Sequence, residues 1–179
     1  LNESIFIQYG IFIEKLFQGD LGISTYTKRP VLVDIVSYFP ATFELVLMSG
    51  LLMILIGMPL GILSGKFKNS LIDNVARLIS LLGVVTPSFL WAIILMLIFA
   101  FWFPILPVSE RMNEALDPPT LVTGLLLVDS LLEGNFKVFG DAFLHLILPG
   151  LAIALPAIGN VARLTLSLIH ISEPTRREG

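Results

Sequence analysis

Three long runs of uncharged, mostly apolar residues alternate with more polar segments along this chain. The first run, 45–65, and the third, 142–162, each hold 21 residues without a formal charge, and 78–109 holds 32. As an α-helix, 21 residues span about 32 Å, the thickness of a bilayer's hydrocarbon core. The middle run is too short for two crossings of about 20 residues with a turn. The pattern predicts an all-α integral membrane protein with spans at about 43–65, 78–102 and 142–162.

Prolines fall inside or just after two of the predicted spans. We expect Pro87 to kink the second span, and Pro104 and Pro107 to end its helix, because proline lacks a backbone N–H and clashes with the preceding turn. Pro149 and Pro156 lie inside the third span. We therefore expect that span to be broken or kinked.

Glycines recur at every fourth residue in the first predicted span, at Gly57, Gly61 and Gly65. This spacing leaves one helical face nearly bare, so that a neighbouring helix can approach closely. It predicts a helix-packing face. The alternative, a buried helix of a large soluble protein, needs a polar shell that the rest of the chain does not supply.

The segments between the spans are expected to lie outside the membrane. Residues 5–17 place apolar side chains near helical spacing, but the uncharged run is too short to cross a bilayer, so we expect a helix on the membrane surface or against neighbouring helices. The residues of 19–22 are typical of a turn. Ser70 and Asp73 have the spacing of a capping box, which predicts a helix start at Ser70.

Lysine and arginine counts indicate the orientation. Residues 66–77 hold three basic residues and Arg163 closes the third span, whereas the longer segment 110–141 holds two. By the positive-inside rule, 66–77 and Arg163 are predicted to be cytoplasmic. Residues 1–39 and 110–141 are then extracytoplasmic, and 1–39 is expected to follow a first helix that is missing.

Composition supports the membrane assignment and removes other classes of protein. Apolar residues make up 55% and charged residues 14% of the 179, mean hydropathy is +0.89, and the net charge is −3. The chain has no basic stretch that would indicate nucleic-acid binding. Because it contains no cysteine, disulfides, thiol catalysis and thiolate metal sites are excluded.

No enzyme signature stands out, so we predict no catalytic, cofactor-binding or metal-ligating residue. His145 fits a hydrogen-bonded structural residue better than a ligand or base. Asp129 and Glu133 could touch a passing substrate, but a solvated loop face is the simpler interpretation. No charged residue is expected inside the spans, which disfavours a secondary transporter.

The end of the chain differs from the rest. LSLIHISEPTR at 166–176 resembles a translated sequencing-library adapter over 11 consecutive residues. We therefore expect 166–179 to be a non-native tail, and the chain to be a fragment whose native part stops at about Thr165.

Several ordered strings resemble the dipeptide/oligopeptide/nickel branch of binding-protein-dependent ABC importer permeases. Together they extend over nearly all of 1–165. The strings are GDLGIS at 19–24, RPV at 29–31, PATFEL at 40–45, SLID at 70–73, TPSF at 86–89, TGLLLVDSLLEG at 123–134 and HLILPGLAIALPAIGNVARLT at 145–165.

The resemblance implies the fold of a type I ABC importer permease with six transmembrane helices, three of them in this fragment. The transmembrane domain would then cover 40–165. It also implies four kinds of partner: a second permease, two ATP-hydrolysing subunits, an extracytoplasmic solute-binding protein and the lipid bilayer. The EAA-type loop that grips the ATPase is expected after Arg163, where the tail stands instead. A secondary transporter and a membrane anchor remain the alternatives, and the solute stays undefined.

Overall fold

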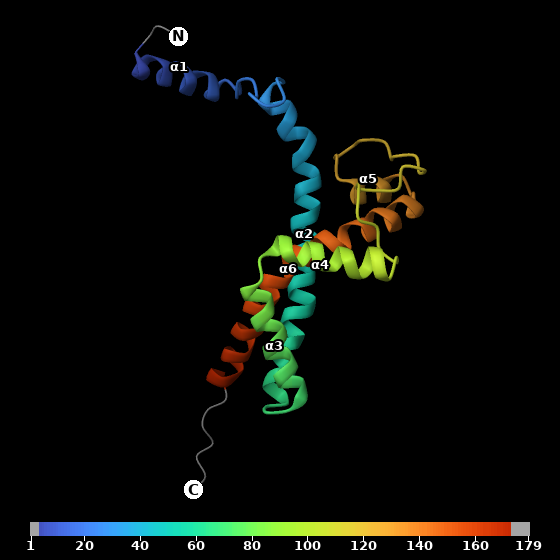
Figure 1. The fold of residues 1–179 in the computed structure, drawn as a ribbon. Helices are drawn as coiled ribbons and strands as arrows, with labels where there is room; N and C mark the ends of the chain where they lie inside the picture. The colour runs from blue at the N-terminus through green and yellow to red at the C-terminus, as the bar shows by residue number, and fades with distance from the viewer. Residues whose placement is uncertain (1–3, 173–179) are drawn as a thin grey trace.

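The computed structural model describes residues 4–172, and the regular elements in that range are helices (Figure 1). Half of the expected tail, 173–179, and the side chains from residue 169 onward lie outside the described part. The elements are α1(Ile5–Phe17), α2(Val31–Lys66), α3(Leu71–Val85), α4(Ser88–Met96), the π-helix η1(Leu97–Trp102), α5(Leu126–Leu132) and α6(Phe136–Ser172).

An N-terminal arm stands apart from the other helices. The helix predicted over 5–17 is present as α1, which extends to one side beyond the N-terminal end of α2 and contacts none of the other described helices (Figure 1). The predicted turn follows it: Gly19 and Gly22 have positive φ, and the Gly22 N–H donates to the Asp20 side chain. The chain then folds back through an isolated bridge between Ile23 and Pro30.

Helix α2 is longer than the span predicted at 43–65. It begins directly after Pro30 and continues through Pro40 and Pro59 to Lys66. An acid in the first turn favours a helix start, and Asp34 takes that place, ion-paired with Arg29. The expected domain boundary at Pro40 therefore falls inside a helix.

The second predicted span is sharply bent. As predicted, Ser70 caps α3, its side chain accepting from the Asp73 N–H, and the helical run ends at Trp102 before two prolines. At Thr86 and Pro87, however, the axis turns by 114°. Thr86 is extended there, the conformation that a following proline favours. This turn is a true break between α3 and α4, larger than the kink that we expected.

Helix α6 is continuous, although a broken third span was one expectation. It runs from Phe136 to Ser172 through Pro149 and Pro156. Each proline frees one carbonyl of the preceding turn, a loss that neighbouring helices compensate in membrane proteins. By length and composition, α2 and α6 can each cross a membrane, and the bent pair α3 with α4–η1 makes a third candidate if it counts as one span.

The centre of the molecule is the packing of α2 and α3 on α6 (Figure 1). Contacts pair Met48 of α2 with Gly150 of α6 and Gly57 with Val161, so these helices run parallel. Helix α3 runs antiparallel to α6, because Gly83 lies against Leu155 and Gly159 against Ser80. Lys66 and Arg163 therefore lie toward one end of the bundle and the segment 110–141 toward the other.

Candidate functional site: a glycine-packed bundle with polar ends

Gly57 and Gly61 of α2 lie against α6 at close range. A Cβ atom placed on Gly61 would lie 2.6 Å from Thr165 Cβ and 2.7 Å from the Ala162 carbonyl oxygen. On Gly57 it would lie 3.1 Å from the Val161 side chain. Gly65 is buried as well. Real Cβ atoms rarely come so close, so a side chain at Gly61 must displace α6.

A second glycine contact, which sequence analysis missed, joins α3 to α6. A Cβ on Gly83 would lie 2.6 Å from the Leu155 carbonyl oxygen, and one on Gly159 would lie 2.5 Å from the Ser80 carbonyl oxygen. The backbones of the two helices thus meet at two points. Small residues at helical spacing on α3, Ala76, Ser80 and Gly83, could have indicated this face.

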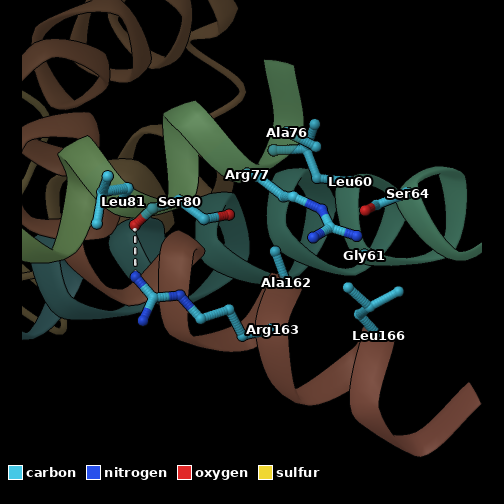
Figure 2. Close-up of a pocket in the computed structure, with 10 residues that line it drawn as sticks. All are labelled: Leu60, Gly61, Ser64, Ala76, Arg77, Ser80, Leu81, Ala162, Arg163 and Leu166. Carbon is cyan, nitrogen blue, oxygen red and sulfur yellow. Dashed lines mark hydrogen bonds between the residues drawn. The ribbon is translucent and has the colours of Figure 1, made fainter. Parts of the chain in front are cut away.

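A cavity of about 380 Å³ opens at one end of this bundle (Figure 2). Its polar lining comes from Ser64 of α2, Arg77 and Ser80 of α3, and Arg163 of α6. The rest of its wall is apolar and includes Gly61. One Arg163 Nη atom donates to the Ser80 carbonyl oxygen at 3.2 Å, shown as the dashed line in Figure 2.

Asp73 holds the turn between α2 and α3 beside this cavity. The carboxylate is 1% exposed. It accepts hydrogen bonds from the Ser64 hydroxyl and the Asn69 N–H, and Arg77 pairs with both of its oxygens. The predicted capping residue therefore also fixes the end of α2, because one carboxylate joins two helices and their turn.

Glu44 performs a similar task at the opposite end of the bundle. It is 6% exposed inside α2 and accepts from Arg111 at 2.6 Å and from the Leu127 N–H at 2.7 Å. The carboxylate thus connects two separate positions of the segment 110–141 to one point of α2. We call 110–141 the outer segment, because it lies at the end of the bundle away from Lys66. Because the predicted span 43–65 contains this residue, our expectation of no charge inside the spans is wrong for Glu44.

Asp129 organises the outer segment, so the expectation of a solvated loop face is wrong for this residue. It is 1% exposed and accepts from the N–H groups of Val122, Thr123 and Gly124 and from the Thr123 hydroxyl. The Thr123 hydroxyl above all, together with these N–H groups, lowers the pKa of Asp129 against the opposing effect of burial. Glu133 remains exposed, as expected.

His145 has the structural role that we expected. Its Nδ1 lies 2.8 Å from the backbone carbonyl oxygen of Asp141, and the Asp141 carboxylate accepts from the Asn113 N–H at 2.6 Å. Within residues 4–172, no group of three or more His, Cys, Asp or Glu side chains is arranged to hold a metal ion. The hydrogen bonds of the buried carboxylates and of His145 therefore position helices and loops.

The family profile and the related proteins that match this chain all belong to transport systems. The profile of the family described as "Binding-protein-dependent transport system inner membrane component" matches residues 57–172. Among curated proteins, the chain is 44% identical over 163 residues to the probable D,D-dipeptide transport system permease protein DdpB of Escherichia coli K12, covering 91% of this chain and 48% of that protein. It is 37% identical over 167 residues to the dipeptide transport system permease protein DppB of Alkalihalophilus pseudofirmus, covering 93% and 50% respectively. The chain spans about half the length of these relatives.

Proposed function

Since this chain belongs to the family of binding-protein-dependent transport system inner membrane components, we propose that it forms part of the permease subunit of an ATP-driven importer for peptides. The observation that carries this proposal is the 44% identity to a D,D-dipeptide permease over 91% of the chain. The helical architecture supports it, because α2 and α6 are each long and apolar enough to cross a membrane.

The proposed assembly contains a second, related permease, two ATP-hydrolysing subunits and an extracytoplasmic solute-binding protein. This chain would supply no catalytic group of its own. The solute would pass between the permeases as ATP binding and hydrolysis in the partners shift the helices between two arrangements. We place the assembly in a prokaryotic plasma membrane, with 66–77 cytoplasmic and 110–141 extracytoplasmic.

In this proposal the transmembrane domain covers 40–165, although its first residue lies inside α2, and 166–179 is a non-native tail. Gly57, Gly61 and Gly65 would keep α2 tight against α6. The buried Glu44 does not favour a proton-coupled carrier, because Arg111 already pairs with it.

A segment exchange tests the proposal. Residues 1–165 would replace the matching segment of the E. coli D,D-dipeptide permease in a strain lacking that permease, and uptake of a labelled D,D-dipeptide would be measured. We expect uptake above the strain without a permease, and loss of uptake when the ATP-hydrolysing subunits are deleted. A chimera that inserts normally but never transports would refute the proposal. Uptake that persists without the ATPases would indicate a secondary carrier.

A further inference from the structure

The end of the bundle where α2 turns into α3 carries an excess of positive charge. Among the residues that the structure describes, the charged side chains at this end are Lys66, Lys68, Asp73, Arg77 and Arg163, four of them basic and one acidic. Arg77 and Arg163 line the cavity between α2, α3 and α6 (Figure 2), and Asp73 is ion-paired with Arg77 beside it. This end of the protein therefore attracts anions.

Asp73, the acid among these described residues, offers no open oxygen to a cation. Both Asp73 carboxylate oxygens accept hydrogen bonds within the turn, from Ser64, Asn69 and Arg77, and the side chain is buried. The polar lining of the cavity thus consists of hydrogen-bond donors and cationic groups. The Asp73 carboxylate is not part of the lining, because it is buried in its ion pair with Arg77.

Arg163 has donor capacity to spare. A guanidinium group carries five N–H donors, and one Nη atom donates to the Ser80 carbonyl oxygen at 3.2 Å. The side chain is exposed, and in Figure 2 its guanidinium group lies beside Ser80 at the edge of the cavity. Planar guanidinium groups suit the bidentate recognition of phosphate oxygens.

The rest of the cavity is apolar and lies at a defined depth. Leu60, Ala76, Leu81 and Ala162 line it. Leu60 lies less than two helical turns before Lys66, where the uncharged stretch of α2 ends. With that stretch in the bilayer, the cavity lies at the boundary between headgroups and acyl chains. A free inorganic phosphate would leave its apolar wall unfilled.

We propose that this cavity binds the phosphate group of an anionic phospholipid. Arg163 and Arg77 would contact the phosphate, and one acyl chain would lie along the apolar wall. Basic pockets between transmembrane helices are known to take acidic lipid headgroups in this way. This inference needs only that the helices stand in a membrane, so it does not depend on the proposed transport activity.

The test is lipid retention by the purified chain, measured by native mass spectrometry in detergent. Phosphatidylglycerol would be compared with phosphatidylcholine of identical acyl chains, and inorganic phosphate would be added as a competitor. Arg163→Gln removes the more open guanidinium group. Lys137→Gln is the matched control, because it makes the same charge change at the opposite end of α6. Leu81→Trp obstructs the apolar wall without changing charge.

We expect preferential retention of phosphatidylglycerol, reduced about fivefold by Arg163→Gln and unchanged by Lys137→Gln. Leu81→Trp should also reduce it, and this variant carries the test if circular dichroism shows that Arg163→Gln misfolds. Equal retention of both lipids by the wild-type chain, or equal loss with Lys137→Gln, would overturn the proposal. If millimolar inorganic phosphate displaces the lipid while Leu81→Trp has no effect, the site takes free phosphate and the lipid assignment is wrong.

Discussion

Three buried carboxylates, Glu44, Asp73 and Asp129, each accept hydrogen bonds from different parts of the chain. Glu44 connects α2 to the outer segment, Asp73 connects the α2–α3 turn to α3, and Asp129 closes its own loop. A buried carboxylate is stable only when its oxygens are satisfied, and each of these three accepts hydrogen bonds from backbone N–H groups or charged side chains. Glu44 and Asp129 therefore set the shape of the segment 110–141.

Replacing Asp129 by Asn should loosen the loop at 122–124. An amide can accept at only one of its two polar atoms, so at least one of the three N–H groups loses its partner. We expect hydrogen exchange of these amides to speed up by about tenfold, the factor for one ordinary hydrogen bond. Hydrogen-exchange mass spectrometry would measure it, with Glu133→Gln as the control because Glu133 is exposed on the same short segment. Equal exchange in both variants would contradict the role given to Asp129.

The lowered pKa of Asp129 sets the pH range in which this loop is stable. A carboxyl group whose pKa falls on folding contributes stability that is fully present above its unfolded pKa, about 3.9, and is lost as pH falls through its lower folded value. We therefore expect the protection factors of the amides at 122–124 to stay constant between pH 7 and pH 5. A decline within that range, measured by the same exchange experiment, would mean that another group controls the loop.

Glu44→Gln should weaken the attachment of the outer segment to α2. The substitution removes the charge that Arg111 pairs with and leaves the Leu127 N–H a weaker acceptor. We expect a loss of about 1–3 kcal/mol in the free energy of unfolding, because a hydrogen bond to a charged group is replaced by a neutral one. Thermal unfolding in detergent would measure the loss, with Glu114→Gln, an exposed acid of the same segment, as the control. A Glu44 variant as stable as this control would show that the ion pair contributes nothing.

Sequence patterns could not show the burial of Asp129 or the pairing of Glu44. Asp129 stands among apolar residues in a short segment, and the N–H groups that it accepts from converge in a turn where Gly124 adopts φ of 79°. Glu44 bonds to residues 67 and 83 positions away in the chain. Contacts between residues so far apart in the chain produce no periodic pattern in the sequence. His145 was expected to be structural because it is a lone imidazole, and its acceptor lies one helical turn away in the same helix.

At the scale of elements, close approach of α2, α3 and α6 determines the bundle. Gly61→Leu should force α6 away, because even a Cβ at this position would lie within 3 Å of two α6 atoms. We expect the free energy of unfolding to fall by about 1–3 kcal/mol, the usual cost of overpacking. The loss would be measured as a lower unfolding temperature and a lower yield of folded protein.

Gly50→Leu supplies the matched control for that substitution. Gly50 lies on the same helix, and nothing lies within 4 Å of a Cβ built on it. The two variants add the same side chain to α2, so only the contact with α6 distinguishes them. If both are equally stable, the glycine face of α2 looks toward lipid and not toward α6.

Apolar run lengths predicted the number of long apolar segments well but the ends of the helices poorly. The 21-residue runs reflect what a bilayer requires, whereas α2 and α6 continue for as long as backbone hydrogen bonding and local capping permit. The effects predicted for the prolines were too large at one site and too small at another. Pro149 is accommodated inside α6, while Thr86 and Pro87 mark a turn of 114°, because tertiary packing decides which prolines interrupt a helix.

At the scale of the whole molecule, the two polar ends give the orientation a direct test. A cysteine at Asn74 should be protected from an impermeant thiol reagent in intact cells, and one at Glu114 should react. Both native side chains are exposed, and the chain contains no cysteine to add background labelling. Asp73 would be a poor position, because it is buried in its ion pair with Arg77. The reverse labelling pattern would invert the proposed orientation.

The length of α2 also determines how far the N-terminal arm lies from the hydrocarbon core of the membrane. Its 36 residues measure about 54 Å, against about 30 Å for the hydrocarbon core. Lys66 ends it at one boundary, so the surplus stands at the other. Even a tilt of about 40° leaves roughly 10 Å of helix above the acyl chains. The exposed rings of Phe6, Phe12 and Phe17 on α1 are therefore lifted clear of lipid, and protein, not membrane, is what can cover them.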